Sequence, residues 1–137
     1  MSKITIKDLY LIFGNDKQHA LRMLKEEKSK SEILKATGCT VAVKDANLSI
    51  REGEIFVIMG LSGSGKSTLL RCINRLIKPT SGEVIITGRD ISNVTDKELL
   101  RIRRKELAMV FQHFGLLPHR SVLHNIACLL YTSPSPR

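Results

Sequence analysis

Gly60-Leu-Ser-Gly-Ser-Gly-Lys-Ser-Thr68 fits the pattern G-x-x-x-x-G-K-[ST] of a phosphate-binding P-loop. The apolar run Ile55-Phe-Val-Ile-Met59 comes directly before it and is typical of a strand buried on both faces. From Leu69 to Ile77, apolar side chains recur at helical spacing. Strand, glycine-rich loop and helix in this order are the context the motif requires, so a glycine-rich turn with a chance lysine is the weaker interpretation.

The residue types in this loop suit a triphosphate. Glycines let successive backbone N–H groups point inward as an anion nest, and the following helix adds its positive N-terminal end. We expect Lys66 to reach the β- and γ-phosphates, the Ser67 hydroxyl to ligate Mg²⁺, and Thr68 to lie near the α-phosphate. The other predicted phosphate-binding residues are Gly60, Ser62, Gly63, Ser64 and Gly65.

The composition is that of a globular protein. The 137 residues are 42% hydrophobic and 26% charged, no apolar stretch is long enough to span a membrane, and residues 1–25 do not resemble a signal peptide. The net charge of +9 is compatible with nucleic acid, anionic lipid or a nucleotide, and its spread along the chain does not choose between them. The widely spaced Cys39, Cys72 and Cys128 are expected to be small buried or incidental thiols.

The residues before the P-loop predict β-structure interrupted by helices. Residues 4–13 read as a strand, 17–27 as a helix, and 40–43 and 47–50 as strands. Ser29-Lys-Ser-Glu32 is a capping box that opens a second short helix, and Gly38 suits its end. A helical insert, about residues 15–38, is therefore expected between two pieces of β-structure.

The residues after the P-loop helix continue the pattern. Residues 83–87 read as a strand, Thr95-Asp-Lys-Glu98 as a capping box, and Leu107-Ala-Met-Val-Phe111 as a second buried strand. The helix after Thr95 is strongly basic, and a solvated face is favoured over a nucleic-acid patch because no groove-reading partners are evident. Its basic residues are Lys97, Arg101, Arg103, Arg104 and Lys105.

The final stretch changes character. A helix capped by Ser121 should continue its apolar face, but residues 128–137 become a Ser/Pro tail. The tail is interpreted either as a disordered natural terminus or as foreign sequence after Ala127, and the second interpretation is favoured. The domain that contains the P-loop is accordingly assigned to residues 1–127, as its N-terminal half.

With these motifs in place, residues 4–127 resemble the first half of an ABC-transporter ATPase subunit, and more narrowly those of glycine betaine/proline uptake systems. The specific pieces are Glu54–Thr68, Ile73–Ile77 with Pro79, Ala108–Gln112, and Ser31–Gly38 in the insert. The resemblance implies an α/β fold of the P-loop NTPase type, with a mixed sheet around the P-loop helix, here truncated. It also implies ATP and Mg²⁺ as ligands, and an intact parent that powers import of a quaternary amine.

The family's remaining site residues are carried over by position. Phe13 stands where an aromatic residue stacks on adenine, although a core role is equally open. Gln112 corresponds to the glutamine that approaches Mg²⁺ and the γ-phosphate, and residues 113–120 would then face a transmembrane permease subunit. A second ATPase subunit, an indirectly associated solute-binding protein and a peripheral place on the cytoplasmic face of the membrane are also implied, with no nucleic-acid partner.

Several catalytic motifs of that family are missing. The sequence has no LSGGQ-like signature apart from the echo in Leu61-Ser-Gly-Ser-Gly65, and neither a Walker B Asp-Glu pair nor a switch histidine. His113, His119 and His124 are not assigned that last role. We expect the chain alone to bind ATP without physiological turnover, and to be poorly soluble because the strand at 107–111 lacks later neighbours. A DNA-repair ATPase, a small kinase and a nucleotide-binding module without turnover are the competing interpretations.

Overall fold

The computed structural model describes residues 1–111 and 115–132, with side chains described as far as Ala127. The chain divides into two compact units, Met1–Leu107 and Ala108–Arg137. The candidate P-loop and the helical insert both belong to the first unit.

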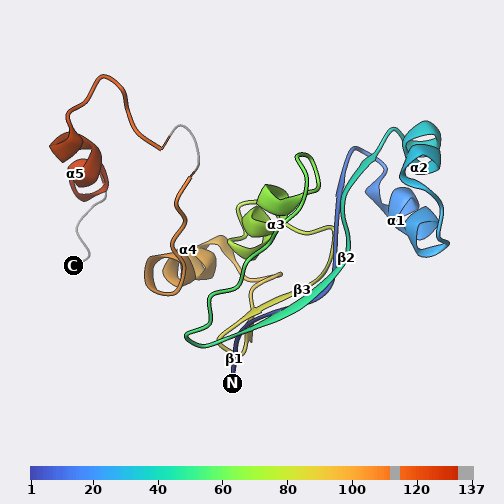
Figure 1. Cartoon of the computed structure of the whole chain (residues 1–137), viewed down its shortest axis with the longest axis horizontal. Coiled ribbons are helices and arrows are strands. Elements are labelled where there is room, and N and C mark those ends of the chain that lie inside the picture. Colours follow the sequence, from blue (N-terminus) through green and yellow to red (C-terminus); the bar gives the residue numbers. More distant parts are fainter. Residues whose placement is uncertain (112–114, 133–137) are drawn as a thin grey trace. The chain divides into compact units, whose positions relative to one another are not determined.

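The first unit is built on a four-stranded sheet (Figure 1). Its strands are β1 (Ser2–Phe13), β2 (Thr40–Arg51), β3 (Ser81–Ile86) and β4 (Arg89–Asp90), in the order β2-β1-β3-β4. All three neighbouring pairs are antiparallel. The predicted strands at 4–13 and 83–87 are confirmed, and the two predicted pieces at 40–43 and 47–50 form one irregular strand.

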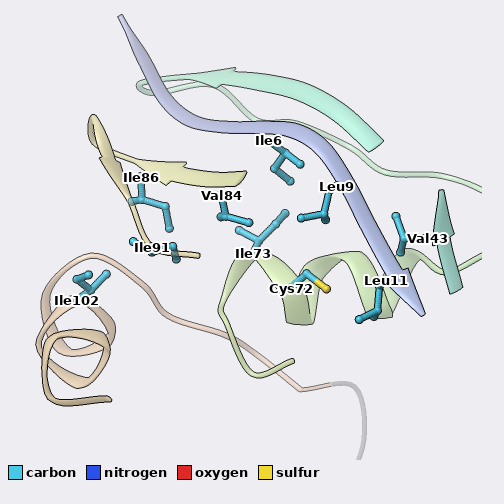
Figure 2. Packing of buried hydrophobic residues seen from close by; sticks show 10 residues of the cluster. All are labelled: Ile6, Leu9, Leu11, Val43, Cys72, Ile73, Val84, Ile86, Ile91 and Ile102. Carbon is cyan, nitrogen blue, oxygen red and sulfur yellow. The ribbon is translucent and has the colours of Figure 1, made fainter. Parts of the chain in front are cut away.

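Helix α3 (Lys66–Ile73) is the P-loop helix, and it packs on this sheet. Its Cys72 and Ile73 are buried in one cluster with side chains of β1 and β3 (Figure 2). These are Ile6, Leu9 and Leu11 of β1 and Val84 and Ile86 of β3. The expected sheet beside the P-loop helix is therefore present, but its described strand pairs are antiparallel and not the mixture of parallel and antiparallel pairs that was expected. The helix ends at Ile73, earlier than the apolar repeat to Ile77 suggested, because Arg75 adopts a φ of 55°, outside the helical range.

The helical insert forms as predicted, with α1 (Lys17–Lys25) and α2 (Lys30–Thr37) beyond one end of the β1–β2 pair (Figure 1). Ser29 and Glu32 make the expected capping box, and Gly38 ends α2 in the left-handed conformation. The insert has its own apolar cluster with the strand ends, made of Ile12, Ala20, Leu24, Ile33, Cys39 and Val41. This cluster fixes α2 against the end of the sheet.

Helix α4 (Asp96–Lys105) begins at the predicted capping box, Thr95 with Glu98, and buries Leu99 and Ile102. The basic side chains of this helix were predicted to form a solvated face, and this prediction is wrong for Arg103. This side chain is half-buried and donates from Nε to the Asn74 carbonyl at 3.1 Å and from Nη2 to the Arg75 carbonyl at 2.6 Å. Arg103 therefore holds the chain just after α3.

Two predicted buried strands are absent from the described structure. Residues 55–59 and 107–111 have no regular secondary structure, and Ile55 and Val110 are 92% and 96% exposed. A strand buried on both faces needs lateral hydrogen-bonded neighbours and cover on each side. Among the described residues, nothing pairs with either run, so apolar character alone does not make them strands.

The second unit contains α5 (Val122–Thr132). The Ser121 hydroxyl accepts from the His124 N–H at 3.3 Å, as expected of its cap, and Asn125 exchanges hydrogen bonds with the backbone of Leu117. The helix continues past Ala127 to Thr132, so a disordered tail does not begin at residue 128. The interpretation of residues 128–137 as foreign sequence stays a prediction. In the part of the chain that the structure describes, no helix is long and apolar enough to cross a membrane.

Candidate nucleotide-binding site

The backbone of the glycine-rich loop takes conformations that require glycine. Gly63 and Gly65 have φ values of 76° and 90°, in the left-handed region. A Cβ atom on Gly65 would lie 2.7 Å from the Ala42 carbonyl oxygen of β2, closer than packed atoms approach. Because Gly65 is the N-cap of α3 and has no side chain, no side-chain oxygen caps the first helical turn. The N–H groups of that turn are suited to an anion.

Lys66 lies folded across the loop. Its ammonium nitrogen donates to the Leu61 carbonyl at 2.6 Å and to Ser64 Oγ at 3.2 Å. The Ser64 N–H also donates to the Leu61 carbonyl, at 3.2 Å. The cation is therefore held at the loop through neutral oxygens, and an anionic phosphate oxygen would bind it more strongly than either.

A cavity of about 310 Å³ beside the loop brings together the P-loop, the end of β1 and the insert. Phe13 and Thr40, which pair across β1 and β2, lie on one side of the lining. The full lining is Phe13, Lys30, Thr40, Val41, Ala42, Gly63, Gly65, Lys66, Ser67 and Thr68. Sequence positions more than 50 apart thus meet at one hollow, as expected for Phe13 and the loop.

A second cavity, of about 370 Å³, shares Lys30, Ala42, Gly65 and Lys66 with the first. It adds Lys44 from β2, together with Gly60 and Ser64 of the loop. Ser62 lines neither of these two cavities and is exposed. Apart from Ser62, the predicted loop residues therefore line one or both of these two adjoining cavities.

The charged residues that line these two cavities are all positive. Lys30, Lys44 and Lys66 line the two cavities, and among the described residues no carboxylate lines either of them. Such a surface attracts an anion of several charges. Sequence reasoning missed Lys30 and Lys44, because their neighbours in the chain carry no phosphate-binding motif.

Phe13 is 43% exposed and belongs to neither apolar cluster of the unit. This exposure disfavours the core interpretation of the residue. An aromatic face at the rim of a basic cavity can stack on a flat heterocycle.

Two of the three thiols are buried and free, as expected: Cys39 in the insert cluster and Cys72 on α3. Burial raises the pKa of the Cys72 thiol to about 11, and the nearby Arg75 opposes this effect. Cys72 is therefore an uncharged packing group on the back of the P-loop helix.

The other predicted site residues lie elsewhere or outside the description. Gln112 and His113 are outside the described residues. Within the described part of the chain, no group of three His, Cys, Asp or Glu residues could hold a metal ion. The Ser67 hydroxyl remains as the predicted Mg²⁺ ligand that the structure describes, and it lies on the wall of the first cavity.

The second unit has a hollow of its own. A mostly apolar cavity of about 290 Å³ lies between the loop before α5 and the start of that helix. Its lining is Leu116, Leu117, Pro118, Arg120, Val122, Asn125 and Ile126. It includes part of the segment 113–120 that was expected to face a membrane subunit.

Comparison with known proteins gives a consistent result. Residues 43–135 match the family model described as "ABC transporter". The ATP-binding protein of the glycine betaine/proline betaine transport system of Escherichia coli K12 is 57% identical over 125 residues, 91% of this chain and 31% of that protein. The glycine betaine/carnitine transport ATP-binding protein of Listeria monocytogenes is 54% identical over 126 residues, 92% of this chain and 32% of that protein. The chain thus spans about a third of the length of these curated relatives.

Solved structures agree with the sequence comparison. A bacterial ABC transporter cassette, solved as a dimer, superposes with a TM-score of 0.71 at 34% identity, covering 98% of this chain and 50% of that one. A post-hydrolysis state of the same cassette, with ADP and Pi bound, superposes with a TM-score of 0.70 at 33% identity, covering 98% and 50%. These likenesses favour a transporter cassette over a DNA-repair ATPase or a kinase.

Proposed function

Because this chain belongs to the ABC transporter family, whose ATPase domain binds ATP, we propose that its P-loop binds MgATP in an ATPase that powers quaternary-amine uptake. The observation that carries the proposal is the basic cavity in which Phe13, Lys66, Ser67 and Thr68 meet. The solute class, glycine betaine, proline or another quaternary amine, rests on the transport systems named for the relatives.

Each part of the site has a role in this proposal. Lys66 exchanges its bonds with Leu61 and Ser64 for β- and γ-phosphate oxygens, and the first-turn N–H groups of α3 receive the phosphates. Thr68 lies beside the α-phosphate. Gly60, Gly63 and Gly65 let the backbone approach the phosphates closely, while Ser62 and Ser64 contribute backbone N–H groups.

Ser67 fits a magnesium ion bound with the nucleotide. A hydroxyl on the cavity wall offers a hard oxygen ligand, and the phosphates supply further oxygens. Mg²⁺ would neutralise charge on the phosphate chain. Gln112 is proposed as a further ligand near the γ-phosphate, on the basis of its position after Ala108-Met-Val-Phe111.

The proposed partners follow from family membership. The apolar cavity around Leu117 and Ile126 is suited to a helix of a transmembrane permease subunit, which would hold this protein at the cytoplasmic face of the membrane. A second ATPase subunit would close over the bound nucleotide with its signature motif, as the family implies. A periplasmic or lipid-anchored solute-binding protein would act indirectly, through the permease.

The test is nucleotide binding by the chain with Lys66 present or removed. Lys66→Ala should weaken MgATP by about ten- to a hundredfold, because a hydrogen bond to a charged group contributes about 1.5–3 kcal/mol. Equilibrium dialysis against labelled MgATP gives the dissociation constants, and circular dichroism checks that both chains are folded. Equal affinities for the two folded chains would overturn the assignment of the P-loop.

A further inference from the structure

The helical insert presents a lysine at the P-loop. Lys30 is the first residue of α2, next to the capping serine Ser29. It lines both cavities, and these share Gly65 and Lys66 at the start of α3. The matched residues of the family model, 43–135, do not include it. Its location is therefore a property of the insert rather than of the P-loop motif.

The insert holds Lys30 in place through packing. Ile33, one turn later on α2, is fully buried with Ile12 of β1 and Val41 of β2. Gly14 directly follows Phe13 and lies close to Cys39. A Cβ atom added to Gly14 would be 2.5 Å from the Cys39 Sγ atom. The strand ends and the insert are thus packed together, and α2 cannot leave the cavity without opening that cluster.

The Lys30 side chain has no structural task in the described part of the chain. The Ser29 N–H and Oγ both donate to Glu32 Oε2, at 2.8 Å each, so the cap is complete without Lys30. No hydrogen bond or ion pair holds the Lys30 ammonium among the described residues. A flexible, unpaired cation on the wall of a cavity without carboxylates is suited to bind an anionic ligand.

We propose that Lys30 is a second phosphate-binding lysine of the nucleotide site, contributed by the helical insert and directed at the phosphate chain from the side of β2. The inference rests on the proposed binding of MgATP at the P-loop. Lys30 is a binding residue in it and takes no part in bond breaking.

The experiment compares three substitutions in the same helix. Lys30→Gln removes the charge at the cavity, Lys30→Arg keeps it, and Lys35→Gln removes an equal charge from an exposed site that lines neither cavity. Glutamine has nearly the helix propensity of lysine, so the folds should match. Dissociation constants for MgATP are measured at low and at moderate salt, with circular dichroism as the check on folding.

Lys30→Gln is expected to weaken MgATP by about three- to tenfold at low salt and to reduce the salt dependence of binding, because one cation at the phosphates is lost. Lys30→Arg should retain most of the affinity, and Lys35→Gln should bind as the unaltered chain does. If Lys30→Gln and Lys35→Gln have equal affinities while Lys66→Ala still weakens binding as expected, this inference is wrong and the P-loop assignment stands. If the unaltered chain does not bind MgATP, or Lys66→Ala binds it equally, the proposed function itself fails.

Discussion

Phe13, the last residue of β1, lines the cavity beside the P-loop. If it stacks on adenine, Phe13→Ala should weaken MgATP by about 1 kcal/mol, roughly fivefold, and leave the stability of the nucleotide-free chain nearly unchanged. The small effect on stability follows from the exposure of the ring, which lies outside both apolar clusters. Titration with MgATP and a thermal melt without nucleotide measure the two quantities.

Phe56 is the matched control, since it is also 43% exposed but does not line the cavity beside the loop. Phe56→Ala should leave the affinity for MgATP unchanged. A lower melting temperature for Phe13→Ala, with no change in affinity, would show that the residue supports the fold instead of binding the base.

Some residues of the candidate site can be predicted from the sequence, and others cannot. Lys66 and Ser67 are part of a motif whose spacing encodes the loop, so their roles can be predicted from the chain alone. Lys30 and Lys44 reach the same cavities only through the packing of the insert and of β2. No local sequence pattern identifies these two lysines. They come close to the P-loop only when elements that are far apart in sequence pack together.

At the scale of elements, α4 stabilises the P-loop helix through one arginine. Arg103→Gln should lower the free energy of unfolding by about 1–3 kcal/mol, because the carbonyls of Asn74 and Arg75 lose their hydrogen bonds to a charged donor. Arg104→Gln, one residue later and exposed, should change it by less than about 0.5 kcal/mol. Urea denaturation of the two variants beside the unaltered chain makes the comparison, and equal losses would contradict the bracing role of Arg103.

The helices that are well predicted from the sequence are those whose ends are marked by capping residues. The capping boxes at Ser29 and Thr95 and the left-handed Gly38 mark boundaries within a few residues of chain, and all three are found in the structure. The runs at 55–59 and 107–111 carry only apolar character. Whether such a run becomes a strand depends on neighbours elsewhere in the chain, and local sequence does not contain that information.

At the scale of the whole molecule, we predict that the 137-residue chain binds MgATP but does not hydrolyse it at a physiological rate. Phosphoryl transfer needs the phosphate clamp, the metal and a group that orients the attacking water, all at once. Residues 113–137 contain no Asp or Glu that could activate water, and a second copy would lack the same group. Steady-state release of phosphate from the purified chain measures the rate.

Lys66→Ala is the control in that assay, because turnover by a contaminant does not depend on this lysine. Lys66-dependent release near one per second would contradict the prediction and would mean that another group replaces the missing carboxylate. Binding without release would also agree with a nucleotide-binding module, so binding and turnover must be measured on the same preparation.

The bond between the Lys66 ammonium and the Leu61 carbonyl, at 2.6 Å, has a spectroscopic consequence. A carbonyl that accepts a charged hydrogen bond vibrates at a lower frequency than one that does not, because the bond draws electron density away from the C=O link. When the ammonium turns to a phosphate oxygen, that stretching band should move upward. An isotopic label on the Leu61 carbonyl carbon would separate this band from the rest of the amide absorption. Infrared spectroscopy could then detect nucleotide binding at the loop without an added dye.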